Sequence, residues 1–177
     1  MMNKFCITFI IIFASVGLSQ IVPIRPKNVP NEAKWFMESW YLSDKYLGGS
    51  NIWYKDGKIM VNRIKIDTKH MKEISYFENG KIRVIGQNIL LENKYRKGNK
   101  RFEWRAYGKW KTFNKEGVLI SEACYTQVYD ASEGEWQSEY CGEEIKYNDK
   151  GTVKERINHK YECKYGCEEL EYKGSSK

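Results

Sequence analysis

Short turns that contain glycine recur through most of this chain, and they constrain its fold more than any other feature. Asn-Gly and Asp-Gly readily adopt the positive φ that tight hairpins require. The clearest turns are Asp56-Gly57 and Asn79-Gly80, and weaker signals follow at Lys97-Gly98-Asn99, Glu116-Gly117, Glu133-Gly134 and Lys150-Gly151. Their glycines are 17 to 23 residues apart. From Ile52 onward the pattern therefore predicts consecutive β-hairpins.

Apolar and charged residues alternate between these turns. In the clearest run, Phe102, Trp104 and Ala106 interleave with Arg101, Glu103 and Arg105. Successive strand residues point to opposite faces, so one face of this strand is apolar and the other is charged. Such one-sided patterning indicates an antiparallel sheet rather than a parallel sheet buried under helices. We predict an all-β, mainly antiparallel fold of stacked hairpins over residues 50–172, with a flexible tail at 173–177.

Residues 1–19 have the features of a cleavable signal peptide. Lys4 supplies a positive start, Phe5 to Val16 supplies the apolar region, and small residues precede a cleavage site after Ser19. The apolar run is shorter than the ~20 residues that a membrane-spanning helix needs. We therefore expect an exported bacterial protein, periplasmic or extracellular, with no transmembrane span after processing.

Two short segments precede the hairpins. Residues 20–30 contain all three prolines of the chain, which remove backbone hydrogen-bond donors and predict an extended, poorly ordered arm. In residues 31–49, Asn31 can cap a short helix from Glu32 to about Leu42. The same residues can form a first strand. The spacing of four between Phe36 and Trp40 slightly favours the helix.

The charge of the chain is positive but dispersed. Processing removes only Lys4 among charged residues, so the net charge falls from +7 to +6. The 158 residues that remain are long enough to form one domain. Lysine and glutamate alternate, which favours a solvated surface of mixed charge. The densest basic group is a candidate anion site: Lys94, Arg96, Lys97, Lys100, Arg101 and Arg105. A soluble hairpin tip has the same composition, and an exported protein rarely meets nucleic acid, so we expect no nucleic-acid partner.

Four cysteines remain after processing, and an even number in an oxidising compartment predicts two disulfides. Cys124 and Cys141 are symmetric about Ser132 and Glu133, so a four-residue loop would place them opposite each other on paired strands. We therefore predict a Cys124–Cys141 bridge, with Cys163 and Cys167 closing a small second loop. Zinc is the alternative, but the chain lacks a Cys-x2-Cys pair, and we expect no metal.

Residues with catalytic chemistry are sparse. His70 and His159 lie in unrelated segments, and the chain has no Gly-x-Ser-x-Gly motif and no glycine-rich phosphate loop. The doublets Glu143-Glu144 and Glu168-Glu169 cannot act as facing carboxylates, because adjacent strand residues point to opposite faces. We expect no catalytic residues, no cofactor and no enzymatic activity.

The turns share a recurring sequence motif, which consists of an aromatic residue, turn residues, a glycine and then a β-branched residue. It occurs at Trp53–Ile59, Tyr76–Ile82, Thr112–Val118 and Tyr147–Val153, with Gly134-Glu-Trp136 followed by Tyr140 and Phe102-Glu-Trp104 followed by Tyr107 between them. This resembles the MORN-variant repeat of exported bacterial proteins, some of whose members are labelled antitoxin-like. The resemblance implies an elongated sheet that serves as a scaffold or binding surface, and it carries over no catalytic residue.

These observations favour an exported, non-enzymatic binding or scaffold protein that uses one face of its sheet. The 13 tyrosines and six tryptophans suit a continuous aromatic stripe on that face. We expect the partner to be an envelope component or another protein, and the sequence does not predict the oligomeric state. The alternative is a small β-barrel that carries an apolar ligand, in which the first strand would pair with the last.

Overall fold

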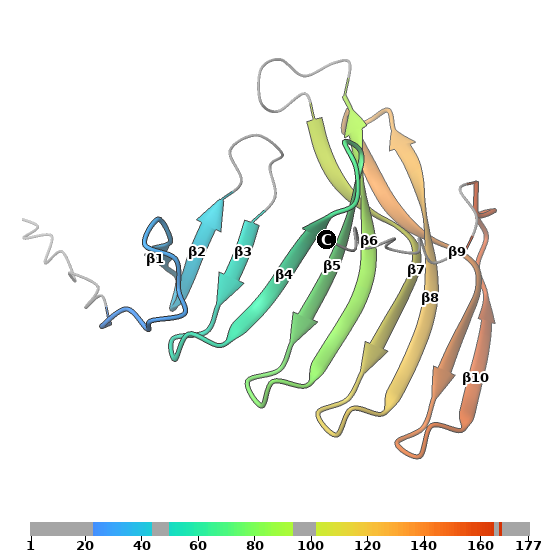
Figure 1. Ribbon diagram of the computed structural model, residues 1–177. Coiled ribbons are helices and arrows are strands. Elements are labelled where there is room, and N and C mark those ends of the chain that lie inside the picture. Colours follow the sequence, from blue (N-terminus) through green and yellow to red (C-terminus); the bar gives the residue numbers. More distant parts are fainter. Residues whose placement is uncertain (1–22, 44–49, 94–101, 165–166, 168–177) are drawn as a thin grey trace, which may run out of the picture.

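The computed structural model describes residues 23–43, 50–93, 102–164 and 167, and within these ranges the fold is all-β (Figure 1). Ten strands follow one another in the chain: β1 (Lys34–Phe36), β2 (Ser39–Ser43), β3 (Ser50–Trp53), β4 (Ile59–Lys65), β5 (His70–Tyr76), β6 (Ile82–Glu92), β7 (Phe102–Phe113), β8 (Leu119–Asp130), β9 (Glu135–Tyr147) and β10 (Val153–Asn158). The predicted signal peptide and C-terminal tail lie outside the described residues. No helix in the described ranges is long and apolar enough to cross a membrane.

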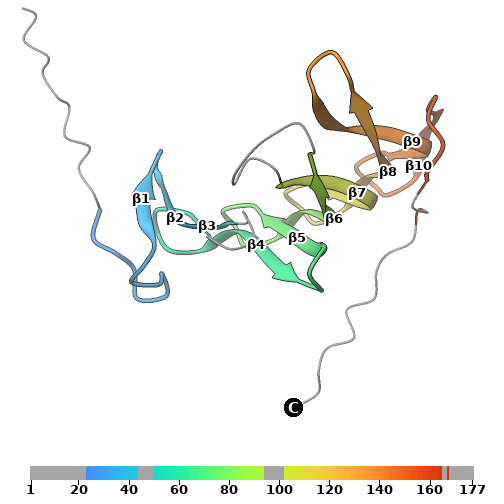
Figure 2. The same ribbon diagram turned by 90° about the horizontal axis from the view of Figure 1, so that it is seen from above.

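All ten strands form one antiparallel sheet whose spatial order is the order of the sequence, β1 to β10. Seen from above, the strands make a single twisted layer (Figure 2). The first and last strands stand at opposite ends, so the sheet is open. The prediction of stacked antiparallel hairpins is confirmed. The alternative of a closed barrel is wrong for the part of the chain that is described, because β1 does not pair with β10.

The slightly favoured N-terminal helix is wrong within the described residues, and the alternative of a first strand in this segment is the one observed. β1 and β2 instead form a tight hairpin, and its two turn residues, Met37 and Glu38, both have positive φ, at 45° and 61°. Trp40 pairs across the sheet with Trp35 on one side and Trp53 on the other, and it is buried between them. The spacing of four that suggested a helix therefore reflects a hairpin in which burial of Trp40 decides the conformation.

The proline-containing segment is folded where it is described. Val29 and Ala33 are buried with Trp40 and Trp53 in a small apolar core at this end of the sheet. Arg25 holds the segment together, because its guanidinium donates hydrogen bonds to the carbonyls of three residues in it: Pro30, Asn31 and Ala33. Residues 23–33 thus form a cap on β2 and β3 in place of the poorly ordered arm that the prolines predicted.

Four hairpin tips lie side by side at one end of the strands and have the same conformation (Figure 1). They span residues 54–58, 77–81, 114–118 and 148–152. In each, the first amide donates to the fifth carbonyl at 2.8–2.9 Å, and the glycine amide donates to the first carbonyl at 2.8–3.0 Å. The glycines at 57, 80, 117 and 151 have φ between 77° and 87°. This is the three-residue hairpin turn that needs a left-handed residue, which explains the recurring glycine.

Each of these tips is followed by a shift in register. The residue before each turn pairs with the residue after it as Trp53↔Ile59, Tyr76↔Ile82, Phe113↔Leu119 and Tyr147↔Val153, and one extra residue is then inserted into the second strand. Such bulges increase the local right-handed twist. Because all four hairpins twist alike, they stack side by side without a break in the sheet.

The registers align one residue from every strand in a continuous row. The row consists of Lys34, Tyr41, Ile52, Val61, Ser75, Val84, Thr112, Ser121, Lys146 and Glu155. Directly paired residues share a face. We call the face that carries this row face A and the opposite one face B. The predicted aromatic stripe is divided between them, since the four aromatic residues before the tips lie on face B.

Side chains also connect successive tips. Lys58 Nζ donates to the Glu78 carbonyl at 3.2 Å, and Lys81 Nζ donates to the Glu116 carbonyl at 2.7 Å. Asn79 Nδ2 donates to the Lys115 carbonyl at 2.9 Å. These hydrogen bonds join the first three of the four tips to one another.

The tip glycines give a direct test of this fold. At Gly80 an added Cβ would meet nothing within 4 Å, so the positive φ of 82° is the sole cost of a side chain there. We expect Gly80→Ala to lower the free energy of unfolding by about 1–2 kcal/mol, measured by urea denaturation. Gly80→Asn is the matched control and should cost clearly less, because asparagine tolerates the left-handed region. Equal stability of all three proteins would contradict the turn conformation.

Candidate functional site

A line of aromatic rings crosses face A over the three longest strands. Trp110 of β7, Tyr125 of β8, Tyr140 of β9 and His159, which directly follows β10, form this line, which we call the aromatic ladder. Their ring centroids are 5.9 Å, 4.6 Å and 4.9 Å apart in that order, and His159 is stacked on Tyr140. These distances lie within the range in which aromatic pairs attract beyond simple burial.

Trp110 begins the ladder because Gly86 on the neighbouring strand leaves room for its ring. A Cβ at Gly86 would overlap the Trp110 indole. The indole Nε1 donates hydrogen bonds to the carbonyls of Gln87 at 3.1 Å and Tyr107 at 3.2 Å. The ring is thus fixed flat across β6 and β7 with its polar atom satisfied.

The middle of the ladder is half open to solvent. Tyr140 is 40% exposed, and Tyr125 beside it is partly buried. Burial raises the pKa of the Tyr125 phenol far above its ordinary value, and its hydrogen bond with Tyr140 raises it further. The Tyr125 phenol is therefore neutral at physiological pH, which leaves the ladder as an apolar surface with a polar edge.

The ladder ends at a carboxylate–imidazole pair. Glu144 Oε2 lies 3.0 Å from His159 Nε2, and Glu144 is only 8% exposed. The His159 amide donates to the Gly142 carbonyl at 2.8 Å, which fixes the backbone of this residue. A buried carboxylate needs such a partner. The pair places hydrogen-bonding groups directly beside the stacked rings.

The second histidine has a similar environment on the opposite face. His70 Nδ1 lies 2.7 Å from Asp67 Oδ2, and its ring lies 5.5 Å from that of Tyr107. The hydrogen bond from His70 lowers the pKa of the Asp67 carboxyl, with further lowering by the Lys69 amide. The two histidine–carboxylate pairs are on different faces of one sheet, so they do not combine into one group.

A shallow groove of about 530 Å³ lies beside the β1–β2 hairpin, along the tips at residues 54–58 and 77–81. Its lining mixes aromatic and charged side chains: Trp35, Glu38, Tyr54, Lys55, Asp56, Lys58 and Glu78. Asp56 and Lys58 neutralise each other across 2.9 Å. This groove is a weaker candidate for a binding site than the ladder, because two of its charged side chains, Asp56 and Lys58, are exposed and already paired with each other.

The four predicted disulfide cysteines do come together, but their pairing differs from the prediction. Cys124 and Cys141 are directly opposite each other in the sheet, as expected. Each is nevertheless bonded to the C-terminal segment, Cys124 to Cys167 and Cys141 to Cys163, with Cα–Cα distances of 5.7 Å and 5.2 Å. The predicted Cys124–Cys141 and Cys163–Cys167 bridges are therefore wrong.

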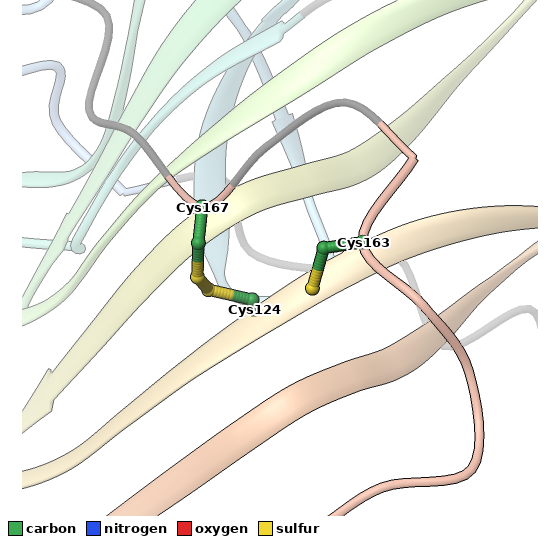
Figure 3. A group of neighbouring side chains, drawn as sticks. All are labelled: Cys124, Cys163 and Cys167. Atoms are coloured by element: carbon green, nitrogen blue, oxygen red, sulfur yellow. A yellow bond between two sulfur atoms is a disulfide. The ribbon is translucent and has the colours of Figure 1, made fainter.

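The course of the chain after β10 explains the different pairing. Tyr161 forms a bridge with Cys141, and its carbonyl accepts a hydrogen bond from the Gly142 amide at 3.0 Å. This contact carries Cys163 to Cys141. Figure 3 shows the side chains of Cys124, Cys163 and Cys167 converging at one point. The sulfurs lie on face B, since Cys124 and Tyr125 are consecutive strand residues that point to opposite faces.

The candidate anion site is only partly visible. Lys94, Arg96, Lys97, Lys100 and Arg101 lie outside the described residues. Arg105 is described, and its guanidinium lies 2.6 Å from a Glu103 carboxylate oxygen and 3.8 Å from one of Glu135. Arg105 is thus engaged with carboxylates and is a poor anion ligand.

The open sheet, its repeated tips and the ladder define a hairpin-repeat protein whose architecture fits a binding or scaffold role. Residues 69–87 and 106–127 match the family model described as the MORN repeat variant, so the chain carries MORN-variant repeats. The first match covers most of the β5–β6 hairpin, and the second covers most of the β7–β8 hairpin, including Trp110 and Tyr125. Neither the curated proteins nor the solved structures gave a match.

A motif in the sequence indicates the first ring of the ladder, but our predictions did not include it. The Gly-x-Trp-x-x-aromatic motif of the repeat occurs as Gly108-Lys-Trp110-Lys-Thr-Phe113, directly before the Gly117 turn. The same spacing recurs 34 residues later from Gly142 to Tyr147, with Glu144 in the position of the tryptophan. Gly108 and Gly142 have the same positive φ of 62°. Glu144 thus replaces the expected ring and instead binds His159.

Alkaline titration tests the burial of Tyr107 on face B. Burial raises the pKa of this phenol from 10.0 to about 12. The folded protein therefore keeps a proton between these pH values that the unfolded chain releases, so the free energy of unfolding falls as the pH rises through this window. We expect Tyr107→Phe to remove part of that fall, measured by urea denaturation across the window. An unchanged slope would contradict the burial.

Peptide mapping tests the disulfide pairing. Trypsin cuts after Lys164, which separates Cys163 from Cys167, and a glutamate-specific protease cuts after Glu133, which separates Cys124 from Cys141. Without reduction, we expect mass spectrometry to find the pairs Cys124–Cys167 and Cys141–Cys163. Opening each disulfide should lower the free energy of unfolding by about 2–4 kcal/mol. A linked peptide that contains Cys124 and Cys141 would contradict this pairing.

Proposed function

We propose that this chain is an exported, non-enzymatic binding protein that holds its partner against face A through the aromatic ladder. The observation that carries the proposal is the ladder itself. Rings from three strands and from the residue after β10 are aligned within 5.9 Å of their neighbours on one open face. The partner is an envelope component or another protein.

The chemistry of the ladder suits recognition. Tyrosine and tryptophan supply large contact areas at a low cost in conformational entropy, and they dominate the binding energy of many interfaces. The rings of the ladder are held in place before binding, because Trp110 is seated on Gly86 and His159 is bound to Glu144. A preorganised surface loses less entropy when its partner binds.

Export is supported by two independent features. Residues 1–19 have the composition of a signal peptide. The two cysteine pairs at disulfide distance are compatible with an oxidising compartment. A small single-layer sheet benefits from such covalent links in the exterior of a cell.

The absence of catalysis is supported by the arrangement of the titratable groups that the structure describes. The pairs Glu144–His159 and Asp67–His70 lie on opposite faces, so neither histidine has the other pair within reach. The pKa of the Tyr125 phenol is raised, which makes it a poor base or nucleophile. Glu144 and His159 then serve as hydrogen-bonding groups at the end of the ladder.

A matched pair of tyrosine variants tests the proposal. Tyr140 and Tyr41 both lie on face A and are 40% and 38% exposed, but only Tyr140 belongs to the ladder. The immobilised mature protein is exposed to an extract of its own cell envelope, and the captured protein or glycan is identified and its affinity measured. We expect Tyr140→Ala to weaken binding about tenfold or more and Tyr41→Ala to leave it unchanged.

Two results would overturn the proposal. Equal loss in both variants would show that the ladder has no special role on face A. Capture of an extracted lipid or pigment, with no protein or glycan, would favour a carrier of apolar ligands instead.

A further inference from the structure

The four cysteines form a cluster whose geometry serves a second purpose. The sulfurs of Cys124, Cys163 and Cys167 all lie within 4.8 Å of one another. The fourth sulfur, that of Cys141, is bonded to Cys163 and therefore adjoins the same point. Four sulfurs that converge in this way are an unusual arrangement for two disulfides, which need no proximity to each other.

We propose that in the reduced protein these four cysteines bind one Zn²⁺ ion, which holds the C-terminal segment on β8 and β9 in place of the two disulfides. The inference concerns face B and does not depend on the partner of the ladder.

The distances suit a tetrahedral thiolate site. A Zn–S bond of about 2.3 Å places the sulfurs of a tetrahedron about 3.8 Å apart. The three sulfurs of Cys124, Cys163 and Cys167 are already within 4.8 Å of one another, so the site requires small movements of side chains. The two chelating halves are a cross-strand pair and the Cys163-x3-Cys167 segment.

The fold supplies the pair that the linear sequence lacks. Zinc was disfavoured because no Cys-x2-Cys pair occurs, but Cys124 and Cys141 are directly opposed on β8 and β9. Opposed strand residues have Cβ atoms about 4.5–5.5 Å apart, a separation that two ligands of one ion can span. Register thus replaces short sequence spacing.

The surroundings of the cluster favour thiolate ligands. Cys124 and Cys141 are buried, which protects the metal–sulfur bonds from water. Lys109 is the register partner of Cys124 on β7, on the same face. A Zn²⁺ ion with four thiolates carries a net charge of −2, and this lysine offsets part of it.

The exchange between the two states is balanced. A dithiol reductant gives each disulfide two electrons and two protons and becomes a disulfide itself. A phosphine gives the two electrons and is converted to its oxide by one water molecule, which supplies the oxygen of the oxide and the two protons of the thiols. Binding of Zn²⁺ then converts the thiols to thiolates and releases their protons, so affinity falls at low pH.

Cobalt serves as the spectroscopic probe in the test. The full mature chain is reduced with a phosphine, its four thiols are counted, and Co²⁺ is added without oxygen. We expect one metal per chain by native mass spectrometry, with the thiolate charge-transfer band and the visible bands of tetrahedral cobalt, and displacement by Zn²⁺. Zn²⁺ should also raise the Tm of the reduced protein and leave that of the oxidised protein unchanged.

Variants separate this site from adventitious binding. Cys141→Ser and Cys167→Ser each remove one ligand and should weaken cobalt binding at least tenfold. His70→Ala removes an imidazole elsewhere on face B and should leave it unchanged. The inference is overturned if the reduced wild-type chain gives no tetrahedral cobalt spectrum, or if it binds cobalt no better than the cysteine variants.

Discussion

Pairing between adjacent strands in a single layer is the constraint on which this structure depends. Within the described ranges no second sheet and no helix packs on either face, the cap of residues 23–33 covers only β2 and β3, and contacts between strands run almost entirely to immediate neighbours. Correct register is then the main source of order. The glycine turns and the bulges after them supply it four times in the same form, and the result is a row of one residue per strand across the whole sheet.

The aromatic ladder follows from the same constraint. Without a second layer, a large ring on face A can be buried only against its neighbours on adjacent strands. Trp110 lies over Gly86, Tyr125 meets Tyr140, and His159 closes the series. The ladder therefore depends on repeats that keep small and large residues in step, and its change from ring to carboxylate at Glu144 occurs at an equivalent position of the next repeat.

Much of the architecture could be predicted from local signals. Asn-Gly and Asp-Gly located the tips, and the symmetry about Ser132 correctly placed Cys124 opposite Cys141. The disulfide pairing could not be predicted, because it depends on where residues 159–163 run after the last strand, and no local pattern encodes that path. The helix expected near Trp40 failed for a related reason: its spacing fits a helix or a short hairpin, and burial between two other tryptophans decided between them.

The two ends of the sheet are secured by different forces. Apolar packing of Val29 and Ala33 closes the β1 end, whereas covalent bonds through Cys163 and Cys167 close the β10 end. Chemical reduction therefore acts on one terminus of the array alone. A chain that loses its sulfur links should fray from β10 inward while the tryptophan-rich terminus stays intact, so the molecule has a built-in direction of disassembly.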